Sequence, residues 1–437
     1  MLPRGFRSAR AAHYRDTTSI CVIAVTPCSD QTALVTIATI AEISLKANVA
    51  ANIVYQRALR KNCTLVWIPA RAMENQISFE GYPALVVAND KIEAVTLIQG
   101  ASLVSLTLRE DPSRLNPLWN PHQSARDHGE EFSRVFPKSP GFGHFVCVDG
   151  FGKVSHAEQE AGLPMHGEAH QQLYEIQRCS KDINVLSVTL SAALPLVQEK
   201  FTRTLHLVDG ENVLYLESEL ENLLAFDRPV NWAEHATIGA PYLERGKTVV
   251  DMPAARASTR NYAPGEPGHR LAPFQEFTWP LAPSLNGAPI DLRAAGPEAS
   301  GDHTTCLMPP DRPHAFIAFL HPDKHKLLGY VFRREEFPWV QNWEYYPANG
   351  QLARGLEFST QPYDVPRREA IQTNSMFGTP TYRWLPAKST IASKFLMFWT
   401  DTPPGFTRID DVRIESGELT VSDISGRTFT LAASLGL

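Results

Sequence analysis

Short runs of alternating apolar and polar residues begin at Tyr82 and recur along most of the chain. The first runs cover residues 84–88, 92–98 and 103–108, with a turn pair at Asn89-Asp90 and a break at Gly100. Successive side chains of a strand point to opposite faces, so alternation over about four to eight residues is typical of half-buried strands. These runs predict the opening meander of an antiparallel sheet.

A second group of runs contains the clearest hairpin signal. Residues 201–208 and 213–220 both alternate, and they flank the pair Asp209-Gly210. An Asp-Gly pair between two alternating runs is the chemistry of a tight hairpin turn. Further strands are predicted at residues 172–177, 185–190, 315–320, 325–333, 355–359 and 393–400. The pattern therefore predicts antiparallel sheets.

Two long stretches lack this alternation. Residues 127–167 are punctuated by glycine and proline, and residues 251–301 are rich in both with scattered charge. We expect loops with few strands there, and long loops inside compact domains tend to carry function. No segment of helical length is convincingly amphipathic, so we predict an all-β fold.

Residues 1–72 do not continue the pattern. The first fifteen hold four arginines and no acid, as in targeting peptides, but the apolar patches that follow are broken by Pro27 and Asp30. A cleaner pattern begins at Met73. We therefore divide the chain into an N-terminal extension, residues 1–72, and one β-sandwich domain, residues 73–437; translation from Met73 would explain the division.

Composition excludes several classes of protein. The net charge is -6 over 437 residues, with lysine and arginine scattered, so no basic stripe for nucleic acid is present. Six cysteines are spread without a C-x-x-C pair, which suits reduced thiols in a cytoplasmic protein better than a zinc ribbon or a disulfide scaffold. No apolar run approaches the roughly 18 residues that span a bilayer, so we expect no membrane partner.

Two stretches hold candidate acid and base groups. His235 lies in residues 231–243, between an acid, an aromatic residue and a Gly/Pro turn, where an imidazole can exchange protons near neutral pH. Its alternative role is a hydrogen-bonded core histidine. Glu357 lies among apolar neighbours in residues 354–358, and such surroundings raise the proton affinity of a carboxylate and suit it to act as a base. Its alternative role is a surface or salt-bridged acid.

A third stretch suggests a metal site. His166 and His170 are four residues apart with Glu168 between them, and imidazoles with a carboxylate are standard ligands of zinc or iron. The spacing is not that of H-E-x-x-H, and Pro164 and Gly167 oppose a regular helix. We therefore predict no metal site and keep a metalloenzyme as an alternative.

These elements, in this order, resemble the galactose mutarotase-like (aldose 1-epimerase) superfamily over roughly residues 82–400. The matching pieces are Ala84–Gly100, Leu163-Pro-Met-His-Gly167, Asn231-Trp-Ala-Glu-His235, Asp302-His303 and Gly355-Leu-Glu357. The resemblance implies a large antiparallel β-supersandwich whose concave face binds a sugar, with no cofactor.

The resemblance also implies roles for single residues. Glu357 would take the proton of the anomeric hydroxyl, and His235 would protonate the ring oxygen. The ring would then open, and closure from the other face would give the opposite anomer. The remaining implied sugar contacts are His166, Asp302, Trp232 as a stacking aromatic, and Arg134 in place of the family's arginine.

One departure from the family affects the substrate. The family's Thr-Asn-His-Tyr-Phe-Asn-Leu signature is replaced by Ala-Glu-His-Ala-Thr-Ile-Gly, which keeps only the histidine of the polar set. The resemblance as a whole favours an aldose 1-epimerase that acts on a small-molecule sugar. The alternative is a carbohydrate-binding protein that keeps the fold without turnover, since a fold does not dictate a function.

Overall fold

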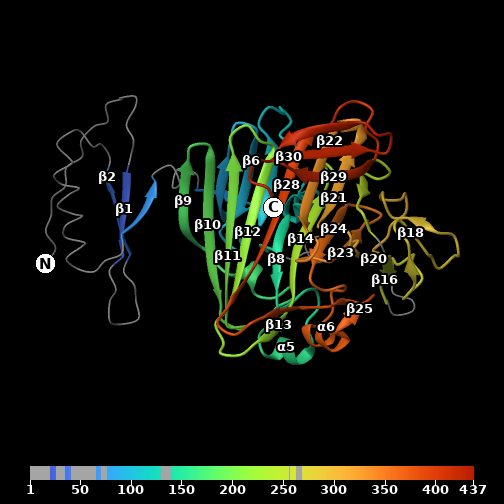
Figure 1. Cartoon of the computed structure of the whole chain (residues 1–437), viewed down its shortest axis with the longest axis horizontal. Helices are drawn as coiled ribbons and strands as arrows, with labels where there is room; N and C mark the ends of the chain where they lie inside the picture. Colours follow the sequence, from blue (N-terminus) through green and yellow to red (C-terminus); the bar gives the residue numbers. More distant parts are fainter. Residues whose placement is uncertain are drawn as a thin grey trace. The chain divides into compact units, whose positions relative to one another are not determined.

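The structure is a computed structural model that divides into two compact units, Met1–Asn75 and Gln76–Leu437. It describes residues 20–25, 35–40, 65–69, 76–128, 139–254, 256–261 and 268–437. In the first unit, β1 (Ile20–Val25) pairs antiparallel with β2 (Val35–Ile40) on one side and with β3 (Leu65–Pro69) on the other. The second unit holds the remaining elements (Figure 1).

The second unit contains two main antiparallel sheets. The larger one, called the large sheet below, has the strand order β17-β16-β20-β23-β24-β14-β8-β7-β6-β5-β4. In chain order its strands are β4 (Gln76–Phe79), β5 (Tyr82–Ala88), β6 (Ile92–Leu97), β7 (Leu103–Leu108), β8 (His144–Val148), β14 (Trp232–Gly239), β16 (Arg256–Thr259), β17 (Glu276–Phe277), β20 (His303–Leu307), β23 (Trp339–Tyr345) and β24 (Ala353–Ser359). The central strand β14 lies between β8 and β24.

The second sheet has the order β15-β21-β22-β28-β12-β11-β10-β9. Its strands are β9 (Glu175–Asp182), β10 (Val185–Leu194), β11 (Glu199–Val208), β12 (Val213–Asn222), β15 (Val249–Asp251), β21 (His314–His321), β22 (Lys326–Arg333) and β28 (Thr390–Asp401). Figure 1 shows β9 to β12 as long neighbouring strands, and the predicted hairpin at Asp209-Gly210 joins β11 to β12.

The described part of the chain contains few and short helices. They are α3 (Pro121–His128), α5 (His156–Glu160), α6 (Arg367–Thr373) and the 3-10 turns Ala169–Gln171 and Pro322–Lys324. Small strand pairs complete the connections, namely β13 (Arg228–Val230) with β27 (Arg383–Leu385), β18 (Leu281–Ala282) with β19 (Ile290–Asp291), and β25 (Ser375–Met376) with β26 (Thr379–Pro380). Among the described residues, no helix is long and apolar enough to span a membrane.

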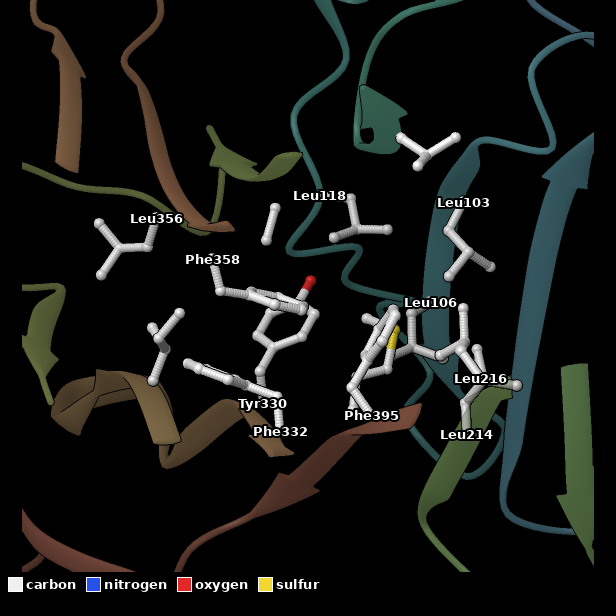
Figure 2. Packing of buried hydrophobic residues seen from close by; sticks show 14 of the residues in the cluster. Leu103, Leu106, Leu118, Leu214, Leu216, Tyr330, Phe332, Leu356, Phe358 and Phe395 are labelled. Carbon is white, nitrogen blue, oxygen red and sulfur yellow. The ribbon is translucent and has the colours of Figure 1, made fainter. Parts of the chain in front are cut away.

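The main hydrophobic core lies between the two sheets. Figure 2 shows side chains of both sheets meeting there, including Leu103, Leu106, Leu356 and Phe358 of the large sheet and Leu214, Leu216, Tyr330, Phe332 and Phe395 of the second sheet. Phe332 and Phe358 stack across the core with ring centroids 4.5 Å apart. Burial of these apolar side chains is the main force holding the sheets together.

A third sheet covers the far side of the second sheet. β29 (Ile409–Glu415), β30 (Glu418–Asp423) and β31 (Thr428–Ala432) form this C-terminal sheet. Its buried Val412, Leu419 and Val421 share an apolar cluster with residues of β21, β22 and β28. Those strands are therefore buried on both faces, which explains uninterrupted apolar runs such as residues 315–320.

The predicted all-β sandwich is confirmed, and the differences are local. Residues 172–177 were expected as a strand, whereas β9 covers residues 175–182; its Arg178, Lys181 and other polar side chains hide the alternation. β14 and β23 carry no readable alternation because nearly all of their residues are buried on both faces. β30 of the C-terminal sheet does alternate between buried and more exposed residues, and it was not predicted. Within residues 251–301, the parts that the structure describes contain only short strands, as expected.

Candidate active site on the large sheet

β14 divides its side chains between the core and a pocket. Trp232 and Glu234 face the core between the sheets, where Glu234 forms a buried ion pair with Arg203 of β11 at 2.6 Å. His235 and Thr237 point to the opposite face, since side chains alternate along a strand. The strand therefore presents its histidine to the pocket side of the large sheet.

The strand register brings the predicted acid and base together. β14 and β24 pair Glu234 with Phe358 and Thr237 with Gly355, which places His235 opposite Glu357. Nε2 of His235 lies 3.1 Å from Oε1 of Glu357, and both side chains are nearly fully buried. Nδ1 of His235 lies 2.9 Å from the hydroxyl oxygen of Thr237. Two residues 122 positions apart in sequence thus lie in direct contact.

Gly355 makes room for the carboxyl group of Glu357. The two residues lie on the same face of β24, and a Cβ atom at position 355 would lie 2.4 Å from Oε1 of Glu357. Such a separation is far inside van der Waals contact, so a side chain at this position would displace the carboxyl group. The glycine of the Gly-Leu-Glu motif is therefore part of the site.

His166 lies in the loop before β9, and its ring is next to that of His235. His166 and Gly167 both adopt positive φ, +67° and +74°. The amide N–H of Gly152 donates a hydrogen bond of 3.1 Å to Nδ1 of His166, so the proton of the neutral ring is on Nε2. Its ring centroid lies 5.2 Å from that of His235, while Phe145 stacks on His235 at 4.2 Å.

These groups line a cavity of about 360 Å³. Its lining combines histidines, two carboxyl groups and aromatic rings: Trp119, Pro121, Ser139, Gly141, Phe145, Met165, His166, His170, Gln171, His235, His303, Trp343, Glu357 and Asp364. Apolar walls with a few converging polar groups are typical of small-molecule sites, and this volume is near the lower end of their range.

Burial keeps the acid/base pair uncharged. It raises the pKa of Glu357 to about 8, an effect that the positive charge of Arg260 partly offsets. It lowers the pKa of His235 well below the ordinary value, and the nearby His166 acts in the same direction. Near neutral pH the carboxyl of Glu357 is therefore protonated and the imidazole of His235 is neutral.

The structure brings together some of the predicted site residues. His166, His235 and Glu357 line the cavity. Asp302 does not: its carboxylate accepts hydrogen bonds from the backbone and side chain of Arg270 at 2.8 and 2.6 Å. Trp232 does not either, because it lies in the core and donates to Glu234. Arg134 lies outside the described residues.

The metal alternative does not fit the geometry. The carboxylate of Glu168 accepts hydrogen bonds from the backbone amides of Leu196 and Val197 at 2.8 and 3.1 Å. It also accepts from Gln172. In the described ranges no group of three histidine, cysteine, aspartate or glutamate side chains is arranged to hold a metal ion.

Sequence reasoning assigned no role to several other residues of the cavity, among them Phe145, His303 and Asp364. Phe145 and Trp343 flank the acid/base pair on β8 and β23, and Phe145 belongs to none of the sequence motifs. His303 was noted only as the neighbour of Asp302. The two residues are adjacent, and it is His303 that lines the cavity. Asp364 follows β24 in a loop. The pairing of β20 with β23 places His303 opposite Trp343. No local sequence pattern predicts that pairing.

Comparison with protein-family models gives no match, and comparison with curated protein sequences gives none. Solved structures do match. A provisionally assigned aldose 1-epimerase from Klebsiella pneumoniae has a TM-score of 0.53 at 13% identity, over 74% of this chain and 80% of its own. A galactose mutarotase-like protein from Clostridium acetobutylicum has a TM-score of 0.52 at 13% identity, over 75% of this chain and 98% of its own.

The Slr1438 protein from Synechocystis matches with a TM-score of 0.50 at 14% identity, over 74% of this chain and 99% of its own. At such identities the likeness concerns the fold. The chain has the galactose mutarotase-like β-sandwich fold, and the suspected resemblance is confirmed at that level.

Proposed function

We propose that the protein is a cofactor-independent aldose 1-epimerase that interconverts the anomers of a small sugar. The observation that carries this proposal is the contact of 3.1 Å between His235 and Glu357 inside a cavity that His166 also lines. An acid and a base side by side suit this reaction, since the anomeric hydroxyl and the ring oxygen are bonded to the same carbon. The fold likeness agrees with it.

Besides the N–H proton that a neutral imidazole keeps, the pair carries one transferable proton on Glu357, which is what the reaction needs. Transfer of that proton from Glu357 to His235 along their contact gives a carboxylate and an imidazolium. The carboxylate takes the proton of the anomeric hydroxyl while the imidazolium gives its proton to the ring oxygen, and the bond between C1 and the ring oxygen breaks. Rotation about the C1 to C2 bond and reversal of both transfers give the other anomer and restore the pair.

Other groups of the cavity hold the sugar. Nε2–H of His166 is the donor that remains after Nδ1 accepts from Gly152, so it can donate to a sugar oxygen. The rings of Trp119 and Trp343 lie 6.0 Å apart edge to face and supply apolar faces for the C–H surface of a sugar.

The test is polarimetry of purified protein with α-glucose, α-galactose and β-xylose. We expect wild type to speed the approach to anomeric equilibrium, and Glu357→Gln and His235→Asn each to lower the rate constant by about a hundredfold or more. Glu175→Gln, an exposed change on β9, is the matched control and should retain full activity. Full activity in both pocket variants would remove this acid/base assignment.

The same variants separate catalysis from binding alone. If the protein is a non-catalytic sugar-binding protein, calorimetry will show binding of one of these sugars while polarimetry shows no rate enhancement. The proposed function predicts both, with Glu357→Gln still binding sugar because the amide keeps the size of the carboxyl group.

A further inference from the structure

A phenylalanine ring lies face to face with the imidazole that the proposed reaction protonates. Phe145 of β8 is the cross-strand partner of His235 of β14, so the two side chains project from the same face of the large sheet. Their ring centroids lie 4.2 Å apart at an interplanar angle of 20°. Phe145 is only 3% exposed, and it lines the cavity with His235 and Glu357. No step of the proposed reaction uses it.

Neighbouring rings hold Phe145 in this position. The ring of His166 lies 5.5 Å from it at 82°, and the ring of His170 lies 5.4 Å from it at 48°. Phe151 packs with it in one buried apolar cluster. A side chain enclosed in this way keeps its rotamer, because turning it would leave a cavity in a close-packed site. The face of Phe145 is therefore preorganised against His235.

The surroundings of His235 oppose a positive charge on its ring. Burial lowers the pKa of His235 well below the ordinary value, and the nearby His166 and His144 act in the same direction. The proposed reaction nevertheless needs an imidazolium at this position, after Glu357 has passed its proton to the ring. Groups that attract a cation must offset part of that cost, and the carboxylate left on Glu357 is one of them. A second such group would raise the rate of the reaction.

The face of Phe145 is suited to attract a positive charge on His235. An aromatic face carries partial negative charge and attracts a cation within about 6 Å of its centroid, more strongly where water is excluded. Phe145 meets this condition at 4.2 Å. Phe151 and Trp343 do not, since their centroids lie 6.3 and 6.4 Å from that of His235. An attraction that is stronger for the imidazolium than for the neutral ring accelerates the step that forms the imidazolium.

We propose that the ring face of Phe145 stabilises the imidazolium form of His235 during the reaction, which makes Phe145 a positioning residue that acts through His235. The proposal rests on the proposed function, because that reaction is what forms the imidazolium. It predicts that the electron density of the phenyl ring, and not only its size, sets the turnover rate.

The test replaces Phe145 in full-length protein with mono-, di- and trifluorinated phenylalanine. Each fluorine withdraws electrons from the ring face while nearly keeping the size of the side chain, so the attraction for a cation weakens stepwise. Polarimetry with α-glucose and α-galactose should show log kcat falling with each added fluorine, to a total loss of about tenfold, while KM changes by less than about twofold. Phe145→Leu, which removes the ring face, should lower kcat by at least as much.

The same fluorinated series at position 151 is the matched control. Phe151 is similarly buried and belongs to the same cluster, but its centroid lies 6.3 Å from that of His235 and the two rings are nearly perpendicular, at 89°. Its variants should keep the kcat of wild type within about twofold. Circular dichroism and thermal melting confirm that each variant is folded.

The outcomes separate this inference from the proposed function. A kcat that stays constant across the series at position 145, in an active wild type, would assign Phe145 a packing role and overturn the inference while leaving the mutarotase activity in place. An equal fall at position 151 would have the same meaning, because the effect would not depend on the stacked face. Wild type that does not convert these sugars overturns both the proposed function and this inference.

Discussion

At the scale of single residues, the central feature is that burial reverses the ordinary charges of an acid and a base. Glu357 and His235 would be a carboxylate and a partly charged imidazole in water near neutral pH. In the cavity the carboxyl keeps its proton up to a pKa of about 8, and the imidazole stays neutral. The pair therefore holds one transferable proton, on Glu357, through neutral pH.

This charge state predicts the pH dependence of the reaction. The kcat/KM should be constant through neutral pH and fall as the pH rises through about 8, because Glu357 then loses the proton that the reaction transfers. On the acid side it should fall only well below the ordinary pKa of histidine, where His235 gains a second proton. Polarimetry in a series of buffers, corrected for the spontaneous rate, measures this profile. A rate that rises through pH 8 would mean that the carboxylate alone is the active form.

At the scale of elements, the site is produced by strand register. β14 and β24 set His235 opposite Glu357, and β23 sets Trp343 opposite Gly355. Because side chains alternate along a strand, a register shift of one residue in β24 would point the side chain of Glu357 toward the core instead of the cavity. The absence of a Cβ at position 355 then leaves the space that the carboxyl group occupies.

The substitution Gly355→Ala tests this arrangement. The added methyl group should displace the carboxyl group of Glu357 and lower kcat/KM by about tenfold or more, with a destabilisation of about 1–3 kcal/mol from overpacking. Gly301→Ala is the matched control, since its Cβ would meet nothing closer than 3.9 Å. Polarimetry and urea unfolding measure the two effects. If Gly355→Ala kept the wild-type rate, the position of the carboxyl group would not limit the reaction.

At the scale of the whole second unit, the C-terminal sheet contributes to stability and lies on a different sheet from the cavity. The cavity lies on the large sheet, whereas the C-terminal sheet buries the far face of the second sheet through residues such as Leu419 and Val421. The core between the sheets includes the fully buried ion pair of Arg203 with Glu234. Changes in the C-terminal sheet should therefore act on stability alone.

Val421→Asp tests that separation. A charge at this fully buried position should lower the free energy of unfolding by about 3 kcal/mol or more. The kcat/KM of the protein that remains folded should match wild type. Thr420→Asp, on the partly exposed face of the same strand, is the control for the added charge. Chemical unfolding and polarimetry on the same samples give both quantities, and a parallel loss of kcat/KM would connect the C-terminal sheet to the site.

The sequence by itself determined the class of fold, most strands of the second sheet, the strands β5, β6, β7 and β24 of the large sheet, and three groups of the candidate site. Alternation and the Asp-Gly turn are local signals, and they located the hairpin of β11 and β12. The ordered motifs selected His166, His235 and Glu357, because each motif is contiguous in the chain, and the structure brings these three residues to one cavity. The same reasoning assigned sugar contacts to Asp302 and Trp232, which the structure places in an ion pair with Arg270 and in the core.

Only the tertiary structure decided which face each side chain of a buried strand takes and which strands are neighbours. β14 is buried on both faces, so no alternation marks His235 as facing the pocket and Trp232 as facing the core. The pairing of β20 with β23 and the loop that carries Asp364 brought His303 into the cavity. These are contacts between segments far apart in sequence, and no local pattern of residues records them.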